Sequence, residues 1–217
     1  MPTLAERLFS TKKHQIMMLQ ARGYEVPDAA ILDFTQDQFN TYYQGSIPKL
    51  TSQIIPKEGS KKKPLLVWYI ETLDKDVPVA DVRQLAAFLT DEHGQTRIFS
   101  HTIIISDQKL GTPAAQTLAE MPAFEVEHFR FDELSYNPTE HFLQSTFHRL
   151  SKNQAKAFFE AMSYVHPSQM PTMYTTDPVA KYYHYQHGDL IMIIRHAVIK
   201  QTPEKEVFYR IVKDVKK

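Results

Sequence analysis

The sequence predicts two consecutive domains, an α/β domain over residues 1–137 and a smaller α+β domain over residues 138–217. Strand and helix patterns alternate between residues 65 and 128, an order typical of helices packed on a small sheet. Around Asn137-Pro138 this pattern changes, and we take that dipeptide as the domain boundary. The 217 residues suffice for two small domains, each with its own core.

Two helices are predicted before the first strand. The first is amphipathic, because four apolar residues fall largely on one stripe: Leu4, Leu8, Ile16 and Leu19. Gly23 stands where the end of this helix needs a left-handed residue. Thr35 and Gln38 have the spacing of a capping box, which predicts a short helix over residues 36–43.

Residues 45–64 are predicted to form an exposed loop. Periodicity disappears there, while Pro, Lys, Ser and Gly accumulate. We interpret the run Lys61-Lys62-Lys63 as a solvated loop face, with nuclear targeting or phosphate contact as the alternatives.

The α/β pattern then begins with an apolar strand over residues 65–70 and a helix over residues 79–90. A second buried strand is predicted over residues 102–105. Thr112 is expected to cap the next helix, with Pro113 at its first position. A half-buried third strand follows, because apolar residues alternate with Glu125 and Glu127.

The second domain has its own start signals. Ser151 and Gln154 form another capping box, and Asp177-Pro178 is a cap followed by a proline suited to a first helical turn. A turn at residues 187–189 is expected to lead into a strand over residues 190–195. The last strand is predicted over residues 206–212.

Composition excludes several classes of protein. Cysteine is absent, which excludes disulfides, thiolate zinc sites and cysteine nucleophiles. The 25 basic residues balance 25 acidic ones, whereas a protein that binds nucleic acid by itself is usually basic. We expect no signal peptide, because charged residues such as Glu6, Arg7 and Lys12 interrupt the N-terminal stretch. We expect no membrane span either, since apolar runs such as residues 65–70 and 190–194 are far shorter than the roughly 20 residues that cross a bilayer.

The chain also lacks a catalytic constellation. No phosphate-binding loop, dinucleotide fingerprint or Gly-x-Ser-x-Gly elbow is present. His184, His187 and Asp189 could in principle ligate a metal, but a Tyr-rich segment before a turn explains them more simply.

A metal-dependent nuclease remains the enzymatic alternative. Such an enzyme needs two carboxylates and a nearby lysine that converge on a divalent ion. Glu71, Glu125 and Glu127 lie on or after strands, yet no lysine follows two residues after any of them. We therefore interpret them as solvated strand faces, and we expect no catalytic residue, metal or cofactor.

The C-terminal domain contains a series of motifs in a fixed order: Asp177-Pro178-Val179-Ala180-Lys181-Tyr182, then Gly188 and Ile194-Arg195, and finally Tyr209-Arg210-Ile211-Val212. In these motifs it resembles the fifth-largest shared subunit of eukaryotic-type DNA-directed RNA polymerases. In that family this part corresponds to the whole of a small archaeal polymerase subunit. The N-terminal motifs Arg22-Gly23-Tyr24 and Thr112-Pro113-Ala114-Ala115 also match in order, so the resemblance covers essentially the whole chain.

The resemblance implies a non-catalytic polymerase subunit. Its N-terminal domain would have a nuclease-like fold without catalytic residues and would form part of the lower jaw beside downstream DNA. Its C-terminal assembly domain would dock on the largest subunit and contact other polymerase subunits. A free-standing adaptor with the same fold is the other alternative.

The resemblance also assigns site residues. Thr112, Pro113, Ala114 and Ala115 match the motif that faces downstream duplex DNA, and any contact made within the complex is expected to be weak. The assembly-domain framework or interface is assigned to a larger set: Asp177, Pro178, Val179, Gly188, Arg195, Tyr209 and Arg210. For Asp177 and Pro178 we expect a framework role rather than direct contact, and the two arginines could pair internally.

Departures from the family pattern indicate a divergent member. Arg195-His196-Ala197 and the turn at residues 201–204 lack the family's usual Ser and Gly, and Ala114 replaces a common Ser. A virus-encoded subunit, a protist protein or a polymerase-specific paralogue would each fit. The expected location is the nucleus, or a virion or cytoplasmic viral factory if a virus encodes the chain, with no membrane association.

Overall fold

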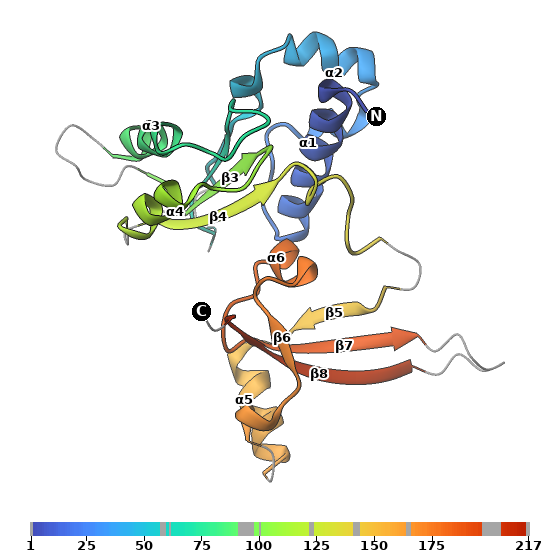
Figure 1. Cartoon of the computed structure of the whole chain (residues 1–217). Helices are drawn as coiled ribbons and strands as arrows, with labels where there is room; N and C mark the ends of the chain where they lie inside the picture. Colours follow the sequence, from blue (N-terminus) through green and yellow to red (C-terminus); the bar gives the residue numbers. More distant parts are fainter. Residues whose placement is uncertain are drawn as a thin grey trace. The chain divides into compact units, whose positions relative to one another are not determined.

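The structure is a computed structural model of the 217-residue chain, which forms two compact units (Figure 1). It describes residues 2–56, 60, 62–90, 98–99, 101–121, 124–140, 144–163, 166–196 and 205–215. Lys61, Ala197 and residues 201–204 lie outside these ranges. The units cover residues 1–136 and 137–217. Among the described helices, none is long and apolar enough to cross a membrane.

The N-terminal unit has a four-stranded sheet in the order β1-β2-β3-β4. These strands are β1 (Ser52–Ile54), β2 (Leu65–Tyr69), β3 (His101–Ser106) and β4 (Glu125–Arg130). β2, β3 and β4 are parallel, whereas β1 runs antiparallel to β2. Each parallel pair needs a crossover, which α3 (Val79–Leu89) and α4 (Thr112–Ala119) supply.

Helices cover both faces of this sheet (Figure 1). On one face α3 and α4 bury a core that includes Leu66, Leu85 and Ile104. On the other lies α1 (Leu4–Ala21), which buries Leu8 and Ile16. The predicted alternation of strands and helices is confirmed. Because successive side chains of β2 and β3 point to opposite faces of the sheet, they enter two separate cores.

The helix signals at the start of the chain are confirmed. Helix α2 (Gln36–Tyr43) begins with the capping box of Thr35 and Gln38. Gly23 follows α1 with φ 81°, a backbone conformation that glycine adopts without strain. The short 3₁₀ helices η1 (Ala29–Asp33) and η2 (Ile47–Leu50) complete this region.

The predicted loop over residues 45–64 is wrong in part, because η2 and β1 form within it. Ile47, Leu50 and Ile54 are buried. A strand of three residues is too short for alternation to reveal it. Lys62 is exposed, as predicted. Its Nζ also donates a hydrogen bond to the carbonyl oxygen of Arg22 at 2.5 Å, so this lysine caps the C-terminal end of α1.

The predicted cap of α4 is also wrong. Gly111, not Thr112, is the N-cap, and the cap makes no side-chain hydrogen bond. A Cβ at Gly111 would lie 3.0 Å from the carbonyl oxygen of Val77, to which its own N–H donates. This close approach of two backbone segments favours glycine at the cap, and Thr112 moves to the first helical position.

The C-terminal unit has a second four-stranded sheet, in the order β5-β7-β8-β6. Its strands are β5 (Thr146–Arg149), β6 (Thr172–Tyr174), β7 (Leu190–His196) and β8 (Lys205–Lys213). β7 is antiparallel to β5 and β8, and β6 is parallel to β8. The two long strands were predicted from the sequence, whereas β5 and β6 were not. The mixed helix and strand content of both units is confirmed.

Two helices cover opposite faces of this second sheet. α5 (Lys152–Ala161), opened by the predicted capping box of Ser151 and Gln154, packs on the face of Leu190 and Ile211. α6 (Pro178–Tyr183) packs on the face of Ile191, Ile193 and Val212. The 3₁₀ helix η3 (Pro167–Gln169) leads into β6.

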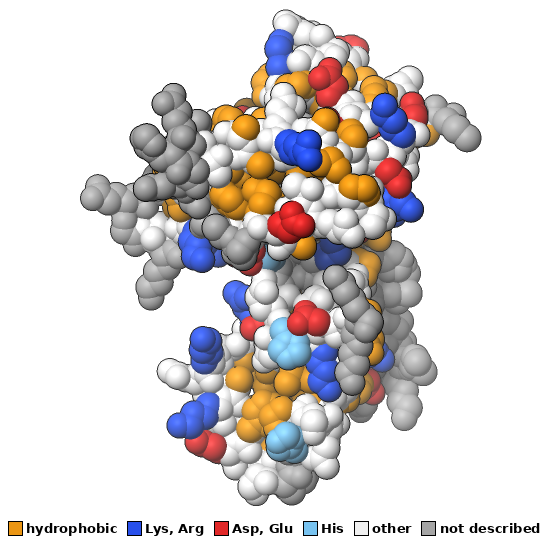
Figure 2. Space-filling view, turned by 60° about the vertical axis from the view of Figure 1, so that its left-hand side comes forward, with side chains coloured by type: hydrophobic (Ala, Val, Ile, Leu, Met, Phe, Trp, Pro, Cys, Tyr) orange, Lys and Arg blue, Asp and Glu red, His pale blue; other side chains and the backbone are white. Residues whose placement is uncertain are grey.

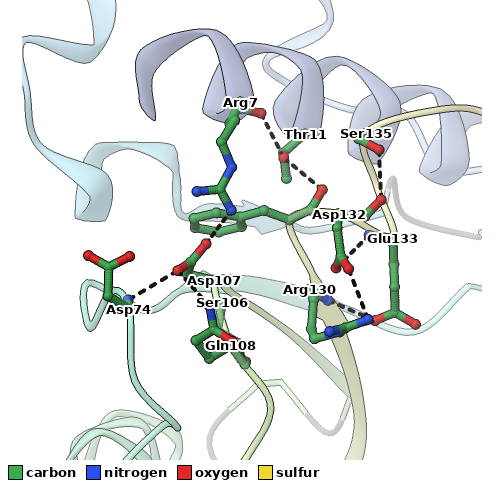
Figure 3. Close-up of polar contacts among 11 residues, drawn as sticks. Arg7, Thr11, Asp74, Ser106, Asp107, Gln108, Arg130, Asp132, Glu133 and Ser135 are labelled. Atoms are coloured by element: carbon green, nitrogen blue, oxygen red, sulfur yellow. Dashed lines mark hydrogen bonds and ion pairs between the residues drawn. The ribbon is translucent and has the colours of Figure 1, made fainter. Parts of the chain in front are cut away.

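Asp107, directly after β3, joins three segments of the N-terminal unit (Figure 3). Its carboxylate accepts hydrogen bonds from the guanidinium of Arg7 on α1, the backbone N–H of Asp74 and the amide of Gln108. Its side chain is 2% exposed. Burial by itself would raise the pKa of Asp107, but these three donors together lower it below 3.8.

We expect Asp107→Asn to weaken the N-terminal unit at pH 7 by about 1–2 kcal/mol, a modest cost because water screens the half-exposed Arg7. Because the folded-state pKa is depressed, the stabilisation is present above pH 3.8 and is lost as pH falls through the folded-state value. Urea unfolding from about pH 2 to about pH 7 tests this. The variant should lose less stability on acidification than the wild type, and parallel pH profiles would contradict the assignment. Asp132→Asn, at an exposed pair with Arg130, is the control.

Candidate interaction surface of the C-terminal unit

The predicted cap at the start of α6 is confirmed. Asp177 Oδ1 accepts a hydrogen bond from the backbone N–H of Val179 at 2.9 Å, and Pro178 occupies the first helical position. Val179 and Ala180 are buried against the sheet. The cap therefore fixes where α6 begins, and α6 in turn forms one wall of a surface cleft.

This cleft has a volume of about 360 Å³. Its floor is apolar, with Met173, Val179 and Ile193 each at most 6% exposed. Phe147 also lines the cleft, and the other lining residues are polar: Gln144, Ser145, Asp177, Arg195 and Arg210. The fold thus brings together four of the predicted assembly residues, namely Asp177, Val179, Arg195 and Arg210.

The two arginines are the charged feature of the cleft. Both are exposed, and among the described residues no ion pair joins either guanidinium to a carboxylate, so the internal pairing that the sequence allowed is not realised there. Arg195 instead lies over the ring of Phe208, 5.0 Å from its centroid. Asp177 uses one carboxylate oxygen for its cap. The cleft can therefore still take up a negatively charged group.

The other predicted assembly residues lie outside the cleft. Gly188 has φ 86° in the turn before β7, and its N–H donates to the carbonyl of Val212 at 2.9 Å. Tyr209 points to the opposite face of the sheet, where its ring packs on Phe158 with centroids 4.4 Å apart. Gly188 and Tyr209 therefore make contacts within the unit, and Pro178 stands at the first position of α6.

The predicted DNA-proximal residues open α4 in the N-terminal unit. Thr112, Pro113 and Ala115 are exposed, but the side chain of Ala114 is fully buried in the core. A helix start offers free N–H groups to phosphate, yet Pro113 has none. Ala114 therefore contributes packing, and the exposed residues around it form the only part of this motif that a ligand could touch.

The carboxylates of the nuclease alternative do not converge. Glu71 follows the carboxyl end of β2, whereas Glu125 aligns through β3 with Leu65 at the other end. Six residues of strand separate these positions, roughly 20 Å. An active metal-dependent nuclease would need these groups around one ion.

The prediction that Glu127 lies on a solvated strand face is wrong. Its two carboxylate oxygens accept hydrogen bonds from the Arg22 guanidinium at 2.7 and 2.8 Å, and His101 Nε2 lies 2.8 Å from Oε1. The side chains of Arg22 and Glu127 are 4% and 13% exposed. Sequence reasoning missed this pair, although the half-buried alternation of β4 and an arginine at the end of α1 were both visible.

Comparison with known proteins gives matches over both units. Residues 136–212 match the family model described as RNA polymerase Rpb5, C-terminal domain. The chain is 25% identical over 214 residues to the Caenorhabditis elegans protein named DNA-directed RNA polymerases I, II, and III subunit RPABC1, covering 95% of each chain. It is 24% identical over 191 residues to DNA-directed RNA polymerase V subunit 5A of Arabidopsis thaliana, covering 87% of this chain and 82% of the relative. It is also 24% identical over 194 residues to the Arabidopsis thaliana DNA-directed RNA polymerase subunit 5-like protein 1, covering 87% of this chain and 89% of the relative.

Proposed function

We propose that the chain is an Rpb5-type subunit and that it serves as a non-catalytic component of a multisubunit DNA-dependent RNA polymerase. The observation that carries the proposal is the similarity to RPABC1, which extends over 95% of both chains and therefore includes both units. The family match to the C-terminal unit supports it independently of the weaker N-terminal motifs.

We further propose that the chain performs no chemistry of its own. The separation of Glu71 from Glu125 and the engagement of Glu127 by Arg22 and His101 support this. Polymerisation would then belong to other subunits of the complex.

The two units would have different roles. Residues 1–137 would form a jaw domain beside downstream DNA, and residues 138–217 an assembly domain that docks on the largest subunit. Exposure of Thr112, Pro113 and Ala115 is compatible with DNA nearby. Any contact would be weak, since on the face drawn in Figure 2 Lys and Arg side chains lie singly among acidic and hydrophobic ones.

The relatives are eukaryotic polymerase subunits, which supports a nuclear location. A virion or a cytoplasmic viral factory is the alternative if the chain comes from a virus. Divergence in the turn over residues 201–204 and at Ala114 motivates that alternative.

Affinity purification of the tagged full chain from its native source tests the proposed function. We expect the two largest polymerase subunits to be recovered in stoichiometric amounts, as measured by mass spectrometry of the intact complex. Recovery of the chain alone, or with partners unrelated to transcription, would overturn the proposal. In that case magnesium-dependent nuclease activity of the purified chain becomes the next assay.

A further inference from the structure

β8 has an edge that the rest of the described chain leaves open. This strand has nine residues, and all but its last two pair with β7 on one side, from Lys205 to Ile211. On the other side β6 pairs only with Ile211–Lys213. Among the residues that the structure describes, no strand covers β8 alongside residues 206–210 on the β6 side.

Backbone alternation shows which groups this edge presents. The N–H of Ile211 donates to the carbonyl of Pro171, away from β7, whereas the N–H of Val212 donates toward β7, to Asp189. Since successive residues of a strand point their backbone groups to opposite sides, Val207 and Tyr209 share the orientation of Ile211. If the parallel pairing of β6 with β8 continued by one more bond, the N–H of residue 171 would donate to the carbonyl of Tyr209. Residue 171 is a proline, which has no N–H. The β6 ladder therefore stops there.

The side chains along this edge are apolar and basic. Val207 and Phe208 are 48% and 41% exposed, which is unusual for large apolar residues in the middle of a strand. Phe208 and Arg210 lie on the same face of the sheet, and the guanidinium of Arg195 covers the Phe208 ring. Both arginines also line the 360 Å³ cleft. We call Val207, Phe208, Arg210 and Arg195 the β8 edge surface.

We propose that an extended, acidic segment of another polymerase subunit pairs as an added strand with residues 206–210 of β8. Its backbone would bond the outward N–H and C=O groups of Val207 and Tyr209, and a carboxylate would lie between Arg195 and Arg210. The inference rests on the proposed function and names the chemistry by which the assembly domain would recognise its partner.

Charge favours this occupant over a second copy of the chain. If the β8 edges of two copies paired, the arginines of both copies would lie close together in one sheet. On β8 only Glu206 would supply a negative charge to offset them. Like charges placed opposite each other across strands are destabilising. An acidic segment instead neutralises two exposed guanidiniums that have no carboxylate partner among the described residues.

Val207→Pro tests the strand pairing in the tagged full chain. The substitution removes an N–H that points away from β7, so it should leave the β7–β8 ladder intact while blocking an added strand. We expect recovery of the largest subunits to fall at least about tenfold. Val207→Ala, which keeps the N–H, should retain most of the recovery and is the matched control.

Arg195→Glu combined with Arg210→Glu tests the charge, with Lys152→Glu on exposed α5 as the control for a change of sign. We expect a loss of recovery of at least about tenfold for the arginine pair only. Thermal unfolding of each purified variant shows whether it remains folded. If the wild type recovers the polymerase and both test variants, shown to be folded, recover it equally well, the edge inference fails while the proposed function stands. If the wild type recovers no polymerase, the proposed function itself fails.

A photoreactive phenylalanine analogue in place of Phe208 identifies the occupant in the purified complex. The expected product is a crosslink to another polymerase subunit, within a few residues of an Asp or Glu. A crosslink to a second copy of this chain, to a segment without acidic residues, or to no protein at all would overturn the inference. This readout does not depend on the folding of a destabilised variant.

Discussion

Arg22→Ala should destabilise the N-terminal unit by about 3–5 kcal/mol, the largest single-residue loss that we expect in this protein. The substitution removes both hydrogen bonds that Arg22 donates to Glu127, whose side chain is only 13% exposed in the intact protein, and leaves His101 Nε2 at 2.8 Å from its Oε1. Without the bidentate guanidinium, little offsets the free-energy cost of removing the Glu127 carboxylate from water. The pair also ties the end of α1 to β4, so both elements should loosen together.

The measurement is urea unfolding followed by the fluorescence of Trp68. Trp68 is the single tryptophan, and it lies in β2, so its signal reports the N-terminal unit separately from the other unit. Lys109→Ala removes an exposed pair with Asp76 and should change the free energy of unfolding by less than about 0.5 kcal/mol. A loss below about 1 kcal/mol for Arg22→Ala would show that the pair contributes no more than a surface contact.

Lys12→Ala is expected to have the second-largest effect, about 2–4 kcal/mol. Lys12 on α1 is fully buried, and its Nζ donates to the Leu50 carbonyl at 2.8 Å and to Ser52 Oγ at 2.6 Å. It also pairs with Asp28 at 3.1 Å. Removing the side chain leaves a cavity and takes the strongest donor from the Leu50 carbonyl.

Lys12→Met separates the volume of this side chain from its charge. Methionine fills most of the same space, and burying an ammonium is itself costly, so we expect no more than about half of the loss seen for alanine. Equal losses for the two variants would show that the charge and its hydrogen bonds, rather than packing, provide the stabilisation. Trp68 fluorescence again follows the unfolding.

The pH dependence of the free energy of unfolding, compared between the wild type and Lys12→Met, tests the electrostatic contribution of Lys12. Burial lowers the pKa of Lys12 below 10.5, and Asp28 only partly opposes this. Just below pH 10.5 the unfolded chain therefore binds more protons at this residue, so the stability of the wild type rises with pH relative to Lys12→Met. Burial raises the pKa of Tyr69 well above 10, which lowers stability at still higher pH in both proteins and cancels in the comparison.

The helix ends were predictable from the sequence because their interactions are local. The capping boxes of Thr35 with Gln38 and Ser151 with Gln154 each form within four residues, as does the bond from Val179 to Asp177. A run of apolar residues likewise determines β2 and β3 wherever the rest of the chain lies. The mixed α/β composition of the chain followed from these local patterns.

Tertiary structure decided the features that depend on distant residues. β1 and β6 have three residues each and exist because they pair with β2 and β8. Glu127 is engaged by Arg22 only because α1 packs on β4, 105 residues away in the chain. The Arg195–Arg210 cleft and the open edge of β8 likewise arise from strand order and from Pro171. Sequence by itself determined which residues could cap, turn or pair, whereas burial and the long-range contacts of the sheet decided which partners their charges and backbone groups received.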